Sequence, residues 1–192
     1  MTAERVRQPG AIAFTDIVGF TDFTAAKGDD AAIEVLDQQA GLVHDVLPVD
    51  GRVVKELGDG LLLWLPSARS AVDACLELLD RFADAERALP ALWVRMGMHW
   101  GRPTRRGDDL VGHDVNLAAR IVDMAAPGEL LVSAGVLDAL GPFEDAARLD
   151  ELGPMVMRGI PEPVRLYRVR RRDLGRDGPV AWSRADTAPG GE

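Results

Sequence analysis

The chain of 192 residues is long enough for one domain with terminal extensions and a sizeable core. Its apolar content of 47% and charged content of 28% match an ordinary globular protein, and its net charge of −9 argues against a general nucleic-acid-binding surface. The single cysteine, Cys75, excludes an intrachain disulfide and cannot by itself supply a cysteine-based zinc site. Because the longest apolar stretches are too short to cross a bilayer and no apolar signal segment follows the N-terminus, we expect a cytoplasmic protein without a membrane span.

Strand and helix patterns follow one another from the N-terminus onward. Residues 11–14 form a short apolar strand pattern that ends at Asp16. A helix is expected to begin near Asp29 and Asp30, whose carboxylates suit a helix start, and to end at Pro48. Steps of three and four residues predict the apolar face of this helix to comprise Ile33, Leu36, Ala40, Val43 and Leu47.

The next segment predicts a hairpin, because two strand patterns at 52–56 and 61–65 flank a turn that contains an Asp-Gly pair. A helix over 68–89 that buries Cys75 as a small core residue follows. The remaining expected elements are a strand at 92–99, a polar loop up to Asp109, a helix at 114–126, a strand at 129–133, a short helix at 136–140, and strands near 155–157 and 164–169.

These elements predict an α+β fold, a ferredoxin-like βαββαβ-type sandwich with a mostly antiparallel sheet and helices on one face. We expect an N-terminal extension over 1–10, a single domain over 11–169 and a flexible C-terminal tail over 170–192. The basic run 170–172 is interpreted as the solvated end of the last strand, and attraction of a nucleotide or a membrane surface is the alternative.

Two carboxylates, Asp16 and Asp59, stand where an apolar strand pattern breaks into a glycine-bearing turn. This position would expose their oxygens at one end of a sheet. One or two carboxylates together with substrate phosphates are the usual way in which proteins hold Mg²⁺, so the pair suits a metal and a nucleoside triphosphate. Taken alone, an Asp in such a setting is more often a simple turn former at the end of a strand.

Asn116 and Arg120 are four residues apart in an expected helix and therefore lie on one helical face. An amide and a guanidinium on the same face could bind a ribose and a phosphate, because the guanidinium fork matches phosphate oxygens and the amide both donates and accepts. A solvated polar face opposite an apolar stripe is the alternative.

Four motifs in order carry a resemblance that covers most of the chain. They are FTDIVGFT at 14–21, KELGDG at 55–60, GMHWG at 97–101 and DLVGHDVNLAAR at 109–120. Together they resemble the catalytic domain of the class III nucleotidyl cyclases, the family of adenylate and guanylate cyclases, over residues 11–169.

The resemblance implies how ATP would be bound and converted into 3′,5′-cyclic AMP and pyrophosphate. It assigns two divalent ions, Mg²⁺ or Mn²⁺, to Asp16, Ile17 and Asp59. It assigns the adenine to Lys55 and Asp109, since an ammonium and a carboxylate match the N1 acceptor and the N6 amino donor, whereas family members that make cyclic GMP typically carry Glu and Cys there. The resemblance further implies that Asn116 orients the ribose and that Arg120 stabilises the charge on the α-phosphate in the transition state. It implies contacts with the terminal phosphates for Arg102 and Arg158.

The resemblance also implies a head-to-tail homodimer in which the metal carboxylates come from one chain and the purine pair, Asn116 and Arg120 from the other. Three alternatives stay open. The first is a guanylate cyclase or a cyclase of relaxed specificity. The second is a catalytically silent nucleotide-binding dimerisation module, and the third is a diguanylate cyclase, which would need a different turn from the LGDG of residues 57–60.

Overall fold

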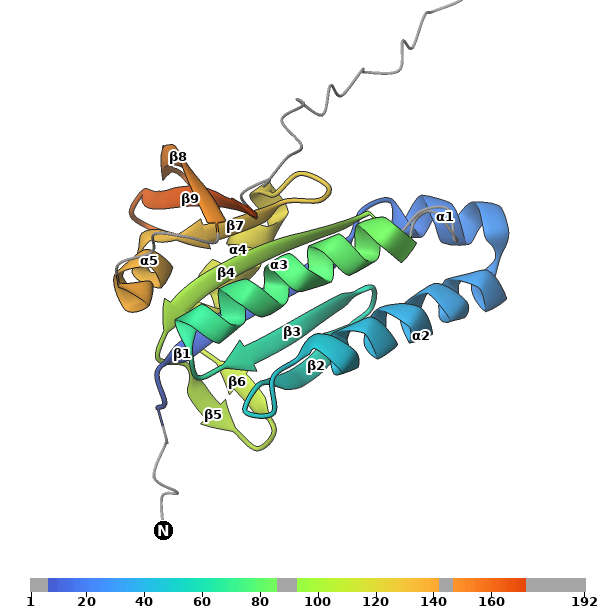
Figure 1. The fold of residues 1–192 in the computed structure, drawn as a ribbon, viewed down its shortest axis with the longest axis horizontal. Helices are drawn as coiled ribbons and strands as arrows, with labels where there is room; N and C mark the ends of the chain where they lie inside the picture. The colour runs from blue at the N-terminus through green and yellow to red at the C-terminus, as the bar shows by residue number, and fades with distance from the viewer. Residues whose placement is uncertain (1–6, 86–92, 142–146, 172–192) are drawn as a thin grey trace, which may run out of the picture.

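A seven-stranded sheet forms the centre of the domain in the computed structural model, which describes residues 7–85, 93–141 and 147–171 (Figure 1). The sheet order is β2-β3-β1-β4-β7-β9-β8, and β5 and β6 form a separate two-stranded ribbon. The strands are β1 (Gly10–Ile17), β2 (Arg52–Leu57), β3 (Gly60–Leu65), β4 (Val94–Gly101), β5 (Thr104–Arg106), β6 (Asp109–Val111), β7 (Leu130–Ser133), β8 (Ala147–Met155) and β9 (Val164–Arg171). The helices are α1 (Phe20–Lys27), α2 (Asp29–Val46), α3 (Ala68–Ala85), α4 (His113–Met124) and α5 (Ala134–Leu140).

The sheet is mostly antiparallel, and its central strands are apolar on both faces. Only the β4–β7 pair runs parallel among the pairs that the structure describes. Nearly all residues of β1 and all of β3 are buried, which is why both strands appear in the sequence as continuous apolar runs rather than alternating ones. A sheet of this kind needs cover on both faces.

The helices provide this cover from both sides. Side chains of α2, α3 and α5 pack with one face of the sheet in the largest apolar cluster, and Phe20 and Phe23 of α1 pack against it. Helix α4 covers the other face, where Val115, Ala118 and Val122 meet Ile12 of β1 in a second cluster. The α+β fold with its mostly antiparallel sheet is confirmed, and the expectation that the helices share one face is corrected at α4, because β1 is apolar on both sides.

Helix α4 approaches the sheet closely at a glycine. A Cβ on Gly97 of β4 would lie 2.2 Å from the backbone nitrogen of Val122, so any side chain at this position would push α4 away. Cys75 is fully buried in α3 within the largest apolar cluster, and burial raises the pKa of its thiol to about 12. Its predicted role as a core residue is confirmed.

Several element boundaries differ from the sequence expectation. Helix α1 and the β5–β6 ribbon were not expected, since the former has little apolar periodicity and the latter lies in a polar segment. Strand β8 covers Ala147–Met155 instead of residues 155–157. It is an edge strand with charged residues and a bulge between Glu151 and Gly153, features that remove the simple apolar alternation of a strand. The expected helix end at 86–89 and the tail beyond 171 lie outside the described residues.

Helix α2 faces the core with a different stripe from the expected one. Its buried residues are Ala32, Val35, Gln39 and Val43. Ile33 and Ala40, which the periodicity placed on the apolar face, are exposed. The buried stripe differs from the expected one because it includes Gln39. This polar side chain points inward, where its amide donates hydrogen bonds to Thr15 and to the Asp59 carbonyl oxygen.

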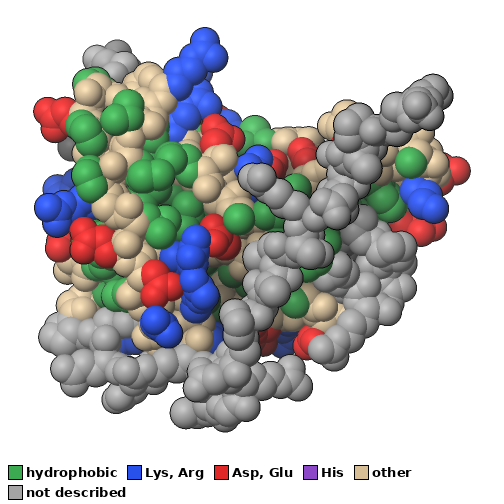
Figure 2. Space-filling view, turned by 90° about the horizontal axis from the view of Figure 1, so that it is seen from above, with side chains coloured by type: hydrophobic (Ala, Val, Ile, Leu, Met, Phe, Trp, Pro, Cys, Tyr) green, Lys and Arg blue, Asp and Glu red, His purple; other side chains and the backbone are tan. Residues whose placement is uncertain are grey.

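A third apolar cluster lies between α4 and the strands β7 and β9, and some of its apolar side chains reach the surface. Figure 2 shows hydrophobic side chains gathered over the part of the molecule that carries β8 and β9. Leu152, Met155 and Val164 are only partly buried against this cluster, and Val156 is 81% exposed. Among the described residues, no helix is long and apolar enough to span a membrane.

Candidate active site

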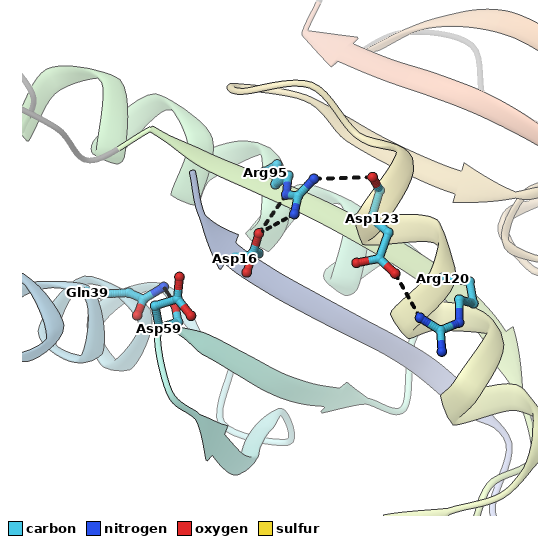
Figure 3. A network of polar contacts seen from close by, with 6 residues as sticks. All are labelled: Asp16, Gln39, Asp59, Arg95, Arg120 and Asp123. Atoms are coloured by element: carbon cyan, nitrogen blue, oxygen red, sulfur yellow. Dashed lines mark hydrogen bonds and ion pairs between the residues drawn. The ribbon is translucent and has the colours of Figure 1, made fainter. Parts of the chain in front are cut away.

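Asp16 and Asp59 lie at the same end of the sheet, although they are far apart in the sequence (Figure 3). Asp16 is the penultimate residue of β1, and Asp59 is in the two-residue loop between β2 and β3. Gly58 opens this loop with φ of 72°, a conformation that favours glycine. Gly60, which follows the loop, lets the chain approach β1 closely. A Cβ at this position would come within 2.7 Å of the Thr15 carbonyl oxygen.

A buried amide fixes the loop that carries Asp59. The Nε2 atom of Gln39 in α2 donates to the Asp59 carbonyl oxygen at 3.3 Å and to Thr15 Oγ1 at 3.4 Å. Thr15 Oγ1 also accepts from the backbone nitrogen of Leu61 at 3.1 Å. Because Gln39 and Thr15 are almost fully buried, these bonds form in a sheltered place and hold the loop in register with β1.

The chemistry of this end of the sheet fits a divalent cation. Burial raises the pKa of Asp59 and the charge of Asp16 raises it further, while a backbone hydrogen bond and the Arg95 guanidinium lower it. A cation between the two carboxylates would relieve their repulsion. No group of three or more His, Cys, Asp or Glu side chains suited to a metal occurs within the described ranges, so further ligands would come from phosphates and water, as is usual for Mg²⁺. Ile17 is 2% exposed and could offer only its backbone carbonyl.

Arg95 of β4 is a partner of Asp16 that sequence reasoning missed. It stands directly opposite Asp16 in the β1–β4 register. Its Nε and Nη2 atoms each lie 2.6 Å from Asp16 Oδ2, and its Nη1 donates to the Asp123 carbonyl oxygen of α4 at 3.2 Å. The only sequence signal is an arginine within an apolar strand pattern, which points to a partner but does not say which one.

Asn116 and Arg120 lie on the outer surface of helix α4, and their spacing of four residues predicted that they share one face. Both residues are exposed, and the Arg120 side chain retains 48% of its accessible surface. Arg120 Nη1 contacts Asp123 Oδ2 at 3.0 Å on the same helix (Figure 3). These groups are therefore available to a ligand or to another chain.

Lys55 and Asp109, the predicted purine pair, meet directly. Lys55 Nζ lies 2.8 Å from Asp109 Oδ2, although the two residues come from β2 and from the start of β6. The hydrogen bond from Lys55 holds the pKa of Asp109 below its ordinary value. The β5–β6 ribbon makes this contact possible because it brings the segment after β4 back beside β2.

The remaining two predicted residues are not brought into these groups. Arg102 follows β4 and is exposed; its backbone nitrogen donates to Asp114 Oδ2 at 2.6 Å. Arg158 is exposed in the turn after β8, beside Gly159 with φ of 80°. Neither side chain forms an ion pair with another residue of the described segments, so their proposed contact with terminal phosphates stays a prediction.

A second polar cluster anchors the start of α4. His99 Nδ1 of β4 lies 2.7 Å from Ser133 Oγ of β7, and His99 Nε2 lies 3.7 Å from Asp114 Oδ1 in the first turn of α4. Burial lowers the pKa of His99, while the charge of Asp114 opposes this shift. The cluster joins the two strands to the helix that carries Asn116 and Arg120.

Comparison with known proteins shows the family to which this chain is related. The sequence profile of the adenylate and guanylate cyclase catalytic domain matches residues 3–171. A pH-sensitive adenylate cyclase of Mycobacterium tuberculosis is 34% identical over 169 residues, which are 85% of this chain and 42% of that protein. An adenylate cyclase of Streptomyces coelicolor is 32% identical over 144 residues, covering 74% of this chain and 37% of that protein. The chain thus spans less than half of the length of these relatives.

Solved structures show the same fold. The adenylyl cyclase CyaB from P. aeruginosa superposes with a TM-score of 0.74 at 25% identity, covering 90% of this chain and all of that one. The guanylate cyclase domain of RhGC from Catenaria anguillulae, solved with GTP, gives a TM-score of 0.77 at 19% identity, covering 86% of this chain and 97% of that one. The chain belongs to the family of adenylate and guanylate cyclase catalytic domains, the class III nucleotidyl cyclases.

Proposed function

We propose that this chain is the catalytic domain of an adenylate cyclase that converts ATP into 3′,5′-cyclic AMP and pyrophosphate. The contact between Lys55 and Asp109 carries the proposal. A carboxylate accepts a hydrogen bond from the N6 amino group of adenine and an ammonium donates to N1, whereas guanine presents the opposite pattern at these positions. Each side chain is more than a third exposed, so a base can reach both groups by entering between them.

The reaction forms a bond between the ribose 3′ oxygen and the α-phosphorus, breaks the bond from that phosphorus to the bridging oxygen of the pyrophosphate, and releases the proton of the 3′ hydroxyl to water. Asp16 and Asp59, with the Ile17 carbonyl, would hold two divalent ions, Mg²⁺ or Mn²⁺. When bound, such ions lower the pKa of the attacking hydroxyl and neutralise charge on the leaving group. Asn116 orients the ribose, and Arg120 stabilises the charge that develops on the α-phosphate.

We further propose that two chains associate head to tail and share each site. Asn116 and Arg120 are exposed on the outer face of α4, where they can reach a nucleotide held by the carboxylates of a second chain. The partly buried apolar side chains near β8 and β9, with exposed Val156, are a surface of the kind that association covers (Figure 2). A twofold dimer would contain two equivalent sites.

Incubation of the purified protein with ATP or with GTP, each with Mn²⁺ or Mg²⁺, tests the activity. We expect cyclic AMP and pyrophosphate as products, identified by chromatography and mass spectrometry, and a lower kcat/KM for GTP. Cyclic GMP as the main product would instead support a guanylate cyclase. Absence of any cyclic nucleotide from a protein that is folded and dimeric would support a silent binding module.

A further inference from the structure

The guanidinium of Arg95 joins the Asp16 carboxylate to helix α4. Two of its nitrogens contact Asp16 Oδ2 at 2.6 Å, and the third donates to the Asp123 carbonyl oxygen at 3.2 Å. The Asp123 carboxylate in turn accepts from Arg120 at 3.0 Å. Figure 3 shows these four residues between the end of β1 and α4, with Arg95 bonded to the backbone of Asp123 and Arg120 bonded to its side chain.

The contact with Arg95 restricts the way in which Asp16 can bind a cation. Oδ2 is the oxygen that Arg95 holds, so Oδ1 is the oxygen of Asp16 left outside this contact. The pair is largely sheltered from water, with 26% of the Arg95 and 29% of the Asp16 side chain exposed, and a charge-assisted bond of this kind fixes side-chain orientation. Groups that orient a ligating carboxylate in this manner commonly change metal affinity by about 10- to 100-fold when they are replaced.

We propose that Arg95 and Asp123 are positioning residues of the cyclase site, Arg95 for the carboxylate of Asp16 and Asp123 for the guanidinium of Arg120. This inference rests on the proposed function, because it takes Asp16 as a metal ligand and Arg120 as the group that contacts the α-phosphate. In the head-to-tail dimer these two groups serve different sites. Arg95 and Asp123 then connect Asp16 to Arg120 through hydrogen bonds. These bonds fix the relative position of the two residues, which one chain supplies to two different sites.

An arginine is required at position 95 for a geometric reason. The planar fork presents nitrogens in two directions, which lets one side chain reach the Asp16 carboxylate and the α4 backbone together. A lysine keeps the positive charge beside Asp16 but cannot reproduce both contacts with one ammonium group. Arg95→Lys therefore separates orientation from charge.

Binding of the Mn²⁺ complex of 3′-deoxy-ATP, which lacks the attacking hydroxyl, tests Arg95 without catalysis. We expect Arg95→Lys to weaken binding of this complex, measured by calorimetry, by about tenfold. The matched control is Arg81→Lys, which changes an arginine in an exposed pair with Glu77 on α3 and should bind as wild type does. If circular dichroism shows that Arg95→Lys is misfolded, Arg95→Gln, which keeps a donor but has no fork, is measured against the same expectation.

Asp123 is tested by a different readout. Asp123→Ala should leave binding of the Mn²⁺ complex within about twofold and lower kcat for ATP by several-fold, because a charge-stabilising group that loses its restraint acts chiefly on turnover. Asp123→Asn keeps an acceptor for Arg120 and should recover much of kcat. Equal kcat in all three proteins would overturn the role of Asp123.

Asp16→Ala distinguishes failure of this inference from failure of the proposed function. Normal binding of the Mn²⁺ complex by Asp16→Ala would remove the metal role of Asp16 and with it the basis of the proposal. Weak binding by Asp16→Ala together with wild-type binding by Arg95→Lys would overturn only the role of Arg95. Weak binding by both, with normal binding by Arg81→Lys, is the expected result.

Discussion

The two halves of the candidate site are built in different ways. Lys55 and Asp109 hold each other through one contact of 2.8 Å and remain more than a third exposed. At the carboxylate end, by contrast, Asp16 and the loop of Asp59 are held by side chains from α2 and β4, which are themselves joined to β1 and α4. A substitution can therefore alter the proposed base-reading pair, Lys55 and Asp109, with little effect on its surroundings, whereas the carboxylate end depends on several elements at once.

The largest expected effect comes from breaking the carboxylate end. Asp16→Ala or Asp59→Ala should reduce the proposed production of cyclic AMP from ATP and Mn²⁺ to below about 1% of wild type, because each removes a proposed metal ligand and a bound metal supplies several kcal/mol of charge stabilisation. Circular dichroism should be unchanged, since neither side chain is part of an apolar cluster. Asp108→Ala, at a fully exposed carboxylate, is the matched control and should keep its activity. Substantial activity in both site variants would contradict the metal assignment.

Mixing two inactive variants tests whether the two halves come from different chains. Asp59→Ala and Arg120→Ala should each be nearly inactive, because a homodimer of either lacks the same group in both sites. In a mixed dimer, one site carries both defects and the other carries neither. When half of the dimers are mixed, activity should recover to about a quarter of wild type, as twofold symmetry requires.

Subunit exchange has to be demonstrated in that experiment, for example by copurification of a tagged and an untagged variant. No recovery despite exchange would mean that Asp59 and Arg120 act within one chain. The head-to-tail arrangement would then be wrong, although the cyclase assignment could stand.

Changing Lys55 and Asp109, the proposed base-reading pair, should affect activity less. The two side chains hold each other through one contact. Lys55→Glu combined with Asp109→Cys should lower kcat/KM for ATP by at least about tenfold and shift the ATP to GTP ratio toward GTP, because the wrong base leaves polar groups unpaired. Thermal unfolding should change little, because both side chains are partly exposed. An unaltered ratio of the two kcat/KM values would rule out these residues as the purine readers.

The sequence predicted the fold class and the chain order of most elements, and its errors have physical causes. Periodicity does not tell which face of a sheet a helix covers when the central strand is apolar on both sides, so α4 was misplaced. It also failed at β8, an edge strand whose charged residues and bulge at Gly153 disrupt alternation. In α2 the inward stripe includes Gln39, and a polar residue in that stripe shifted the expected face.

At the candidate site, the sequence named residues for which we propose direct roles, but not the residues that contact them. Asp16 and Asp59 could be selected as candidates because each lies in a local motif, where an apolar strand pattern ends in a glycine-bearing turn. Arg95 is 79 residues away from Asp16 in the chain, and its contact with Asp16 follows from the β1–β4 register, which no local pattern reveals. Gln39 lies four positions from each of two buried valines, and this spacing could have indicated that it is buried. Its hydrogen-bond partners, Thr15 and the Asp59 carbonyl oxygen, could not be predicted from the sequence.

The smallest expected effect concerns the attachment of α4 to the sheet at the end away from Arg95. His99 is sheltered, with 15% of its side chain exposed, and it faces Ser133 of β7 and Asp114 and His113 of α4. Burial lowers the pKa of His99 in the folded chain, with Asp114 acting in the opposite direction. The unfolded chain then binds the proton more readily than the folded one at pH values just below the ordinary histidine pKa.

This linkage predicts that His99 does not reduce the free energy of unfolding above a pH of about 6.5, the ordinary pKa of histidine. Below that pH, the free energy of unfolding decreases because the unfolded chain takes up the proton first. We expect the free energy of unfolding, measured in urea between pH 7.5 and pH 5.5, to fall more steeply for wild type than for His99→Gln, whose amide can still bond Ser133 but does not titrate. Carboxylates shared by both proteins contribute equally to both curves, so the difference isolates His99. Parallel curves would show that His99 takes up its proton equally well in the folded chain, in which case the contact with Asp114 offsets the whole effect of burial at the start of α4.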